Sequence, residues 1–400
     1  MRDPMRVLRL SSVFEPAPAG ALPPPRFDPV GGMQTHTGEL TRALDALGVW
    51  QTVVTTGPPG GVRCSSFGRH AALVRLGARF PVFRQCYAVP AARVVHRLAA
   101  RADLVHAHLG EDIAIVPLAL SAAWRHRLPL VLTVHSSMRH TLPISGARSA
   151  VLRVLGGTLE RYGERRAQAV ITLTTRLARL LAAHGVPADR LHVIPSGVRR
   201  ALFHSADGAH LVDVPRPRVL FLGRLHRQKG VADLVRALAL VPSAHLVLAG
   251  DGPERARLSR LAGVLGLAHR VRFLGFVPHD QVPALLRDVD LLVMPSRYEE
   301  LGTALVEARH VGVPVVATRV GGIPDVVRDG VDGLLVPPGD IVALAGALQR
   351  LVDDPVLADV LASRARRRAA SYTWDSLAER VLDVYQRVVR EYEPARRGSR

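Results

Sequence analysis

Short apolar, branched segments recur along the chain with helix-like segments between them. In the first half they are "RVLRLSSV" (6–13), "QTVVTT" (51–56), "LVHAH" (104–108), "LVLTVH" (130–135), "AVITLT" (169–174) and "LHVIPSG" (191–197). A second series follows residue 215: "RVLFLG", "AHLVLAG", "VRFLGFV", "DLLVMPS", "PVVAT" and "GLLVPP". Strands that alternate with helices predict parallel sheets covered on both faces. The chain is therefore predicted to be an α/β protein with two such sheets.

The polar, proline-punctuated segment between the two series predicts a domain boundary near residue 215. It spans residues 203–219 and has no repeating period, as expected of a linker. A chain of 400 residues is also long enough for two hydrophobic cores. We expect an N-terminal domain over 1–210, a C-terminal domain over 216–375, a helix over 376–392 that packs back toward the N-terminal domain, and a basic tail over 393–400.

The net charge of +19 raises the question of a nucleic-acid or membrane partner. Lys229 is the only lysine among the 53 basic residues, and asparagine is absent. Both residues have AT-rich codons, so this pattern indicates a GC-rich genome, such as that of an actinomycete. The arginines are dispersed, and the aromatic residues do not interleave with them as base-stacking platforms would. We therefore expect no nucleic-acid partner.

Cysteine content and hydropathy bear on the compartment. Cys64 and Cys86 cannot form a disulfide framework in a chain of this size, which suits a reducing cytoplasm. No apolar run approaches the 18 residues of a membrane-spanning helix. We expect a cytoplasmic protein without stable membrane association.

A basic loop follows the first strand of the second series. In "LGRLHRQKG" (222–230), Gly223 ends the strand, Arg224 comes next, and Lys229 precedes a helix expected to begin near Val231. Ligands of doubly wound sheets bind beyond the carboxyl ends of the strands. An arginine fork and a lysine charge there could neutralise a diphosphate. A solvated basic turn is the alternative that this segment alone leaves open.

The segment "PSRYEELGTALVEA" repeats this arrangement of strand, polar loop and helix. A helix that begins around Gly302 would leave the backbone N–H groups of Gly302, Thr303 and Ala304 free to bind an anion. Glu299 precedes this helix, and Glu307 lies one to two turns inside it. Taken singly, each carboxylate is better explained as a surface charge; the pair gains force from the basic loop.

Other motifs give little support for a cofactor or a metal. "GDGPE" (250–254) lacks the third glycine of the dinucleotide fingerprint. "DVD" (288–290) runs into an apolar segment and is better explained as the entry to a strand than as a metal-binding pair. No His/Cys cluster has metal-ligand spacing. His106 and His108 alternate at a strand end and are expected to face the same side.

These segments together resemble the retaining glycosyltransferases of family 4, which have the GT-B fold of two facing Rossmann-like domains with an active-site cleft between them. Ser196 stands where that family usually has Asn, and "HSSMRH" replaces its commoner "HD" form, which leaves the role of His135 open. The resemblance spans nearly the whole chain. It is carried by "GRLHRQKG", "GDGPE", "FLGFVPHDQVPALLRDVDLLVMPS", the Glu299-to-Glu307 element, "GGIPDVVRDGVDGLLVPPGD", "GGMQTH", "DLVHAH", "LTVHS" and "VIPSGV".

The resemblance implies a UDP-sugar as co-substrate, either UDP-GlcNAc or UDP-glucose, bound in the cleft. The diphosphate would meet Gly223 of the basic loop, Arg224 and Lys229, the amides of residues 302–304, and the Gly31–Gly32 turn. Glu307 would bind the ribose hydroxyls, Glu299 the sugar hydroxyls, and His135 the sugar near the reacting carbon. Retention would proceed by front-face attack, with Arg224 and Lys229 stabilising the leaving phosphate. No metal is then required.

The segment "RFDPVGGMQTHTGELTRALDALGV" (26–49) resembles the 2-deoxystreptamine glycosyltransferases of aminoglycoside antibiotic biosynthesis. 2-Deoxystreptamine is a diamine that a +19 protein repels unless its site is locally acidic. Asp28, Glu111 and Asp112 are the candidate carboxylates. A solvated loop or, for Asp112, a helix N-cap is the alternative.

Other functions remain possible on the same fold. A family 4 transferase for an inositol phosphate or phosphatidylinositol would place basic residues such as Arg139 or Arg148 near the acceptor. A sugar-nucleotide epimerase would need added acid/base groups, and a phosphorylase an inorganic-phosphate site. A binding protein without activity would not need so complete a set of donor motifs.

Overall fold

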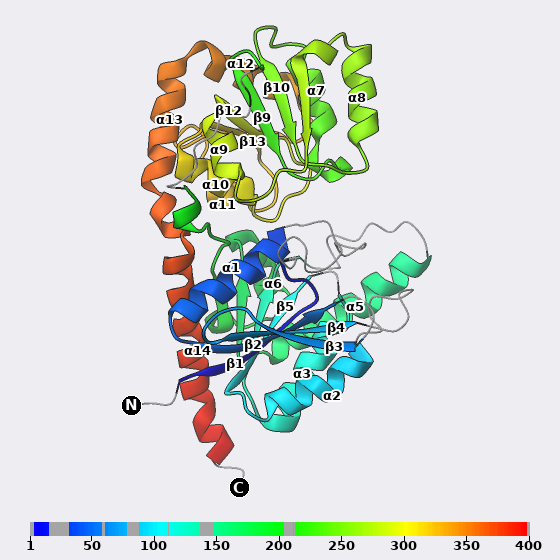
Figure 1. The fold of residues 1–400 in the computed structure, drawn as a ribbon, viewed down its shortest axis with the longest axis vertical. Helices are drawn as coiled ribbons and strands as arrows, with labels where there is room; N and C mark the ends of the chain where they lie inside the picture. Colours follow the sequence, from blue (N-terminus) through cyan, green and yellow to red (C-terminus); the bar gives the residue numbers. More distant parts are fainter. Residues whose placement is uncertain are drawn as a thin grey trace. The chain divides into compact units, whose positions relative to one another are not determined.

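The computed structural model divides the chain into two compact units. Unit 1 comprises Met1–Pro195 and Leu377–Arg400, and unit 2 comprises Ser196–Ser376. Each unit is a sheet of mostly parallel strands flanked by helices (Figure 1). The predicted α/β class with two sheets is confirmed. The residues that the structure describes are 4–15, 32–57, 61–77, 88–110, 112–136, 147–203, 211 and 213–397.

The sheet of unit 1 has the strand order β3-β4-β2-β1-β5-β6-β7-β8. Its strands are β1 (Arg6–Ser11), β2 (Trp50–Thr56), β3 (Gly61–Ser66), β4 (Ala71–Gly77), β5 (Leu104–Leu109), β6 (Leu130–Val134), β7 (Ala169–Thr172) and β8 (Leu191–Val193). Its helices are α1 (Gly32–Ala46), α2 (Ala88–Ala99), α3 (Ile115–His126), α5 (Ala147–Arg166), α6 (Thr175–Ala183) and the C-terminal α14 (Trp374–Arg397).

Strands β3 and β4 were not among the predicted strands. β3 is exposed at every residue and pairs antiparallel with β4 at the edge of the sheet. An exposed edge strand needs no apolar residues, so its sequence lacks the pattern by which the buried strands were found.

The two faces of the unit 1 sheet differ in chemistry. One face buries aliphatic residues such as Leu8, Leu10 and Leu132 in a core with helices α2 and α3. Residues that alternate with them are polar yet equally buried: Arg9, Gln51, His106, His108 and Thr133. The strands "RVLRL", "LVHAH" and "LVLTV" therefore alternate between an apolar and a polar face, although both faces are covered.

The sheet of unit 2 has the order β11-β10-β9-β12-β13-β14 and is parallel throughout its described strands. The strands are β9 (Arg218–Leu222), β10 (His245–Ala249), β11 (Val271–Gly275), β12 (Leu291–Met294), β13 (Val315–Thr318) and β14 (Leu334–Val336). The helices are α7 (Val231–Leu238), α8 (Arg255–Val264), α9 (Val282–Arg287), α10 (Thr303–Val311), α11 (Ile323–Val326), α12 (Ile341–Asp353) and α13 (Pro355–Arg367).

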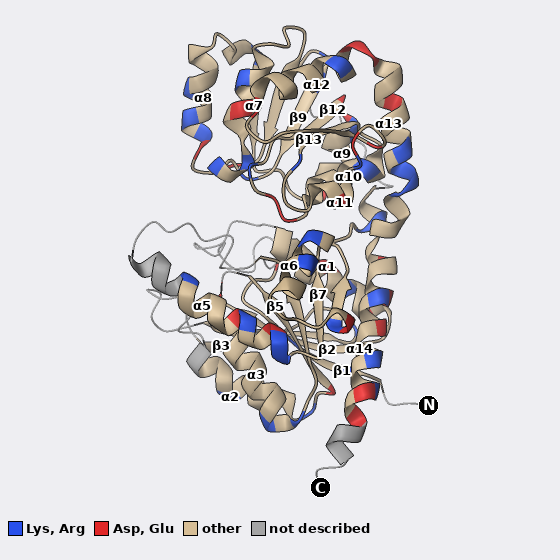
Figure 2. Ribbon diagram, turned by 180° about the vertical axis from the view of Figure 1, so that it is seen from behind, with Lys and Arg blue, Asp and Glu red and all other residues tan. Residues whose placement is uncertain are grey.

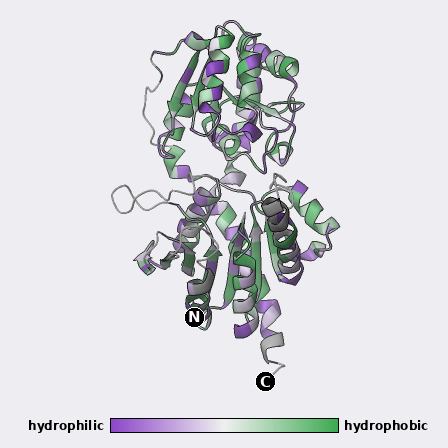
Figure 3. Ribbon diagram, turned by 90° about the vertical axis from the view of Figure 1, so that its right-hand side faces the viewer, coloured by the Kyte–Doolittle hydropathy of each residue, from purple (hydrophilic) through white to green (hydrophobic). Residues whose placement is uncertain are grey.

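The strand order of unit 2 reverses between β9 and β12. The chain runs from β9 outward to β11 and then returns to place β12 on the other side of β9. Such a switch point opens a crevice at the carboxyl ends of the two strands. Apolar cores lie on both faces of this sheet, and the hydrophobic strands contrast with the hydrophilic residues on the helices (Figure 3).

The unit boundary differs from the predicted one near residue 215. The contacts place it between Pro195 and Ser196. Val198 forms a β-bridge with Thr373, and Phe203, Leu211 and Val214 are buried in the core of unit 2. This segment lacks a repeating period because it contributes isolated anchors to a core.

The C-terminal helix groups with unit 1 from Leu377 onward. Its Tyr385 is fully buried and hydrogen-bonds His106 of β5 at 2.6 Å. The tail beyond Arg397 lies outside the described residues.

Arginine residues are spread over helices of both units, including α5, α8, α13 and α14 (Figure 2). None of the helices searched, all from the described part of the chain, combines the length and apolar character that a membrane crossing needs.

Candidate active site

The predicted basic loop lies at the switch point of unit 2. It leaves β9 at Gly223, forms a short 3-10 turn over Arg227–Lys229, and enters α7 through Gly230, whose φ is 65°. A Cβ at Gly230 would lie 1.9 Å from the carbonyl oxygen of Pro295. The amide of Arg297 donates to the Gln228 carbonyl at 2.7 Å. The loops after β9 and β12 are thus locked together, and this close approach requires glycine.

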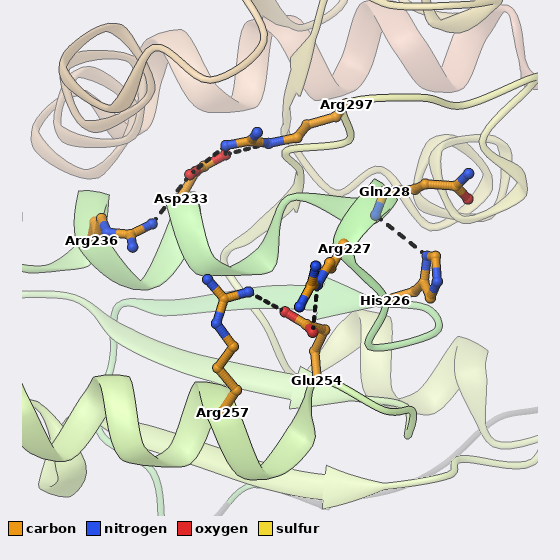
Figure 4. A network of polar contacts seen from close by, with 8 residues as sticks. All are labelled: His226, Arg227, Gln228, Asp233, Arg236, Glu254, Arg257 and Arg297. Atoms are coloured by element: carbon orange, nitrogen blue, oxygen red, sulfur yellow. Dashed lines mark hydrogen bonds and ion pairs between the residues drawn. The ribbon is translucent and has the colours of Figure 1, made fainter. Parts of the chain in front are cut away.

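Several charges around the basic loop already have partners (Figure 4). The Arg297 guanidinium donates to both carboxylate oxygens of Asp233 at 2.9 to 3.1 Å. Arg257 and Arg227 donate to Glu254 at 2.6 and 3.3 Å. The arginines of these pairs are more than half exposed, so each pair is expected to contribute little to stability.

Lys229 and Glu299 come together, as the hypothesis of a donor site requires. The Lys229 Nζ lies 2.5 Å from Glu299 Oε2, and the Ser296 hydroxyl is 3.5 Å from the same oxygen. Both charged side chains are partly exposed, at 28% and 13%. Arg224 is exposed, and among the described residues none accepts a hydrogen bond from its guanidinium. Two cations and a carboxylate can therefore meet a ligand here.

Helix α10 begins at Thr303, as predicted. Gly302 precedes it with a φ of 82°, and the Leu305 amide donates to the Gly302 carbonyl at 2.9 Å. The amides of Thr303 and Ala304 precede that bond, in the turn where helical N–H groups have no helical acceptor. These are the N–H groups that the sequence predicted to bind an anion, and that role stays a prediction.

Glu307 lies in α10 and is 5% exposed. Its Oε1 is 2.9 Å from His279 Nε2, a residue of the loop after β11. The sequence prediction did not assign a role to His279. Its position just beyond a strand end was the available signal, but nothing in the sequence indicated that it contacts Glu307.

Glu299 is fixed through its backbone as well as its side chain. Gly321, in the loop after β13, has a φ of 54°, and a Cβ there would lie 1.5 Å from the Glu299 carbonyl oxygen. The Gly322 amide donates to that oxygen at 3.2 Å. The glycines of "VGGIPD" therefore allow this loop to pack directly against the residue that meets the sugar in the hypothesis.

A buried ion cluster anchors the other end of α10. Arg309 is 1% exposed and donates to Asp332 at 3.2 Å and to the Val326 carbonyl at 2.5 Å. Arg328 and Arg368 also pair with Asp332. Burial alone would raise the pKa of Asp332, but hydrogen bonds from Arg328 and Arg368 and the charge of Arg309 hold it below its usual value. This cluster ties α10 to the 326–332 turn and to α13.

In unit 1, His135 directly follows β6 and belongs to a buried group of histidines. Its ring lies 4.5 Å from that of His36 in α1, and its Nε2 is 3.1 Å from Nδ1 of His108. Burial and the charge of Arg9 lower the pKa of His135 to about 3. Burial likewise holds the pKa values of His36, His106 and His108 well below 6.5. As predicted, His106 and His108 face the same side, with ring centroids 4.3 Å apart.

This histidine group is the place where a metal ion has to be considered. Nitrogen atoms of His36, His108 and His135 lie within 4.8 Å of one another. Arg9 places its NH2 group 2.8 Å from His108 Nε2, so a cation would bind beside a buried positive charge. This charge disfavours a metal site.

Three of the remaining predicted site residues lie outside the described residues: Asp28, Gly31 and Glu111. Gly32 is the first residue of α1. Asp112 is 2% exposed and accepts the Ala114 amide at 2.8 Å, in the turn before α3. It is not the N-cap considered as the alternative, because Ala114 holds that position and no side chain caps the helix. The role of Asp112 toward an acceptor stays a prediction.

Two doubly wound units in one chain, the second with its binding loops at a switch point, are the architecture of glycosyltransferases with the GT-B fold. The chain belongs to Glycosyltransferase Family 4. That family matches residues 30–202, and the family described as Glycosyl transferases group 1 matches residues 206–368.

Three relatives with named activities are similar in sequence to this chain. The 2-deoxystreptamine N-acetyl-D-glucosaminyltransferase of Streptomyces fradiae is 34% identical over 98% of this chain and 97% of its own length. The 2-deoxystreptamine glucosyltransferase of Streptomyces kanamyceticus is 34% identical over 83% and 93%. The D-inositol 3-phosphate glycosyltransferase of Acidothermus cellulolyticus is 34% identical over 73% and 69%.

Solved structures share the fold. Sucrose-phosphate synthase from Thermosynechococcus elongatus has a TM-score of 0.78 at 24% identity, over 96% of this chain and 99% of that chain. Anabaena HepE in complex with UDP-glucose has a TM-score of 0.74 at 22% identity, with the same coverage.

Proposed function

We propose that the protein transfers a hexose from a UDP-sugar to a hydroxyl of 2-deoxystreptamine, with retention of configuration at the anomeric carbon. The observation that carries this proposal is the meeting of Lys229 and Glu299 at the switch point of unit 2. A cation for phosphate and a carboxylate for sugar hydroxyls are thus adjacent. The named activities of the two Streptomyces relatives support the acceptor and leave glucose and N-acetylglucosamine as the candidate sugars.

The proposed roles follow from charge and position. Arg224 and Lys229, with the amides of Thr303 and Ala304, bind the diphosphate and stabilise the charge that grows on it as the glycosidic bond breaks. Glu307 binds the ribose hydroxyls through its Oε2, which accepts no hydrogen bond from the described residues, while Oε1 accepts from His279. Since side-chain cations and helix amides neutralise the diphosphate, the reaction needs no metal.

His135 and Glu299 contact hydroxyls of the transferred sugar in this proposal. The acceptor hydroxyl attacks the anomeric carbon from the side that the phosphate leaves, and the leaving phosphate oxygen takes its proton. One C–O bond forms as another breaks, which gives the α-linked product and UDP. Asp28, Glu111 and Asp112 are the carboxylates proposed to meet the diamine.

The decisive experiment incubates the purified protein with 2-deoxystreptamine and a panel of nucleotide sugars, in the presence of EDTA. We expect one UDP-hexose to give a pseudodisaccharide, identified by mass, with an α linkage shown by the anomeric proton coupling in NMR. Lys229→Met or Arg224→Met should lower kcat by about 100-fold or more, the scale of losing one transition-state stabilising group. A product that is β-linked, or that forms only with added metal, contradicts the mechanism.

Arg227→Met is the matched control for these variants. Arg227 lies in the same loop, but its side chain is 78% exposed and pairs with Glu254. Its removal should leave kcat within about threefold, because exposed ion pairs contribute little. Equal losses for Arg227→Met and Lys229→Met would mean that general loop disruption, and not phosphate binding, explains the effect.

An inositol phosphate is the second candidate acceptor, favoured by the Acidothermus relative and by the net charge of +19. The basic residues suggested for it fall where the structure describes no side chains: Arg139 lies outside the described residues, and the side chain of Arg148 is not described. Including D-inositol 3-phosphate in the same panel decides between the two acceptors.

A further inference from the structure

A chain of hydrogen bonds connects the buried Arg9 of β1 to His135. The Arg9 Nη2 atom is 2.8 Å from Nε2 of His108, and Nδ1 of His108 is 3.1 Å from Nε2 of His135. All three residues are buried, at 0%, 0% and 8% exposure. Both ring nitrogens of the middle histidine are therefore engaged, one by a cation and one by the next ring.

The arginine determines where the protons on both rings lie. A guanidinium has donors only, so Arg9 donates and His108 Nε2 accepts. His108 is neutral because burial holds its pKa far below 6.5, and a neutral imidazole has one N–H. That proton must be on Nδ1, which donates to His135 Nε2. His135 then carries its own proton on Nδ1.

The Arg9 guanidinium is held in place by further hydrogen bonds. Its Nη1 donates to the Thr41 hydroxyl at 2.6 Å and to Gln51 Oε1 at 3.0 Å. The Gln51 side-chain Nε2 in turn donates to the Thr41 carbonyl at 3.0 Å. Helix α1 and strand β2 thus hold the guanidinium through Nη1, while Nη2 contacts His108.

The same proton order opposes a metal at this cluster. A metal on His108 Nδ1 would shift the proton to Nε2, where two donors would then face each other at 2.8 Å. The tautomer of His106 is not determined in this way. His106 bonds the hydroxyls of Thr133 and Tyr385, which can each donate or accept, so Arg9 does not set its tautomer.

We propose that Arg9 is a positioning residue that, through His108, makes His135 a hydrogen-bond donor by its Nδ1. His135 thereby offers a sugar oxygen a fixed N–H and cannot act as an acceptor or as a general base at that atom. The part concerning the sugar rests on the proposed function, whereas the proton order is a property of the free protein.

The test is nitrogen NMR of the free protein with ring-15N-labelled histidine, using long-range proton–nitrogen correlations that distinguish protonated from unprotonated ring nitrogens. Loss of a spin system in His135→Gln assigns that residue. We expect Nδ1 of His135 to be the protonated nitrogen. A protonated Nε2 on His135 in the unmodified protein overturns the proposal, whatever reaction the enzyme catalyses.

Substitutions of residues in this hydrogen-bond chain separate the effect of polarity on the His135 tautomer from the effect of packing. In His108→Gln, the amide oxygen can accept from Arg9 and the amide N–H can donate to His135, so the Nδ1–H form should persist. In His108→Leu the Nδ1–H form of His135 should be lost. It should also be lost in Arg9→Met, whereas Arg9→Lys, which keeps a donor, should retain it. Thr41→Val removes one of the two acceptors of Arg9 Nη1. Because Gln51 Oε1 still accepts from that group, the His135 signal should stay unchanged.

Activity gives the second readout. If His135 donates to the sugar, kcat/KM should fall about 10-fold in His108→Leu, the scale of one lost hydrogen bond, and should recover in His108→Gln. Equal activity of the Gln and Leu variants, both folded, would contradict the positioning role. Failure of glycosyl transfer with an intact Nδ1–H signal would instead reject only the proposed function.

Discussion

At the residue scale, the cluster of His36, His106, His108 and His135 makes unit 1 sensitive to acid. These side chains are neutral when folded because burial lowers their pKa values, that of His135 to about 3. In the unfolded chain they titrate near 6.5. Below that pH the unfolded state binds protons that the folded state does not, so stability falls as the pH decreases.

We therefore expect the free energy of unfolding to decrease below pH 6.5 by up to about 1.4 kcal/mol per pH unit for each of these histidines. Urea unfolding followed by circular dichroism between pH 7.5 and 4.5 measures it. His106→Gln keeps hydrogen-bonding groups for Thr133 and Tyr385 but removes one titrating ring, so the slope between pH 5.5 and 4.5 should flatten by about that amount. An unchanged slope would mean that His106 is protonated in the folded protein.

Single residues also show how far sequence reasoning reaches. Lys229 and Glu299 were assigned to one site because each stands in a loop at a strand end, and the structure brings their side chains together at one edge of the parallel sheet. The contact of His279 with Glu307 depends on how two loops pack, which no local pattern contains. Likewise, the alternation of β1 places Arg9 on a face, but its bond to His108 appears only when strands β1 and β5 pair.

At the element scale, α10 is held at both ends by different means. Its start is set by Gly302 and its last turn by the buried Arg309, which pairs with Asp332. Glu307 lies between these two points. The placement of Glu307 therefore depends on the Arg309–Asp332 pair, which lies outside the candidate donor site.

Asp332→Asn should remove the charge that balances Arg309 and lower the stability of unit 2 by about 3–5 kcal/mol, as expected when one partner of a buried pair is lost. Thermal unfolding measures the change. Asp329→Asn is the control: its pair with Arg319 is about half exposed, and the amide oxygen can still accept from Leu335, so the loss should stay below about 1 kcal/mol. Similar losses for both would contradict the special role of the cluster.

The elements themselves were largely predictable. The parallel strands from β5 to β14 correspond to segments rich in apolar residues, because each of them contributes residues to a hydrophobic core. The exposed β3 was missed for the converse reason. The unit boundary was displaced because Leu211 and Val214 are single apolar anchors in a segment without period.

At the scale of the whole molecule, the net charge of +19 acts oppositely on the two proposed substrates. A UDP-sugar is an anion that the field attracts, and 2-deoxystreptamine is a cation that it repels. Figure 2 shows the basic residues spread over several helices, so this field is not confined to one loop. Added salt screens both effects.

We expect the KM for the UDP-sugar to rise and the KM for 2-deoxystreptamine to fall as the ionic strength increases from about 0.01 to about 0.15 M, where the Debye length shortens from about 30 to about 8 Å. Initial rates with each substrate varied in turn measure both constants. An inositol phosphate acceptor would show a KM that rises with salt. If two different salts give the same KM values at equal ionic strength, binding of a specific ion does not explain the change.

The contact between Lys229 and Glu299 has a consequence for turnover. In the proposed reaction, phosphate draws Lys229 away and the sugar takes its place beside Glu299. After transfer the sugar is gone, and the carboxylate has lost both the sugar and its cation. The lysine is then drawn back to the carboxylate, which weakens its hold on UDP. The ion pair thus competes with UDP for Lys229 after transfer, so that product inhibition by UDP should be weaker than in a variant in which Glu299 is replaced by Gln.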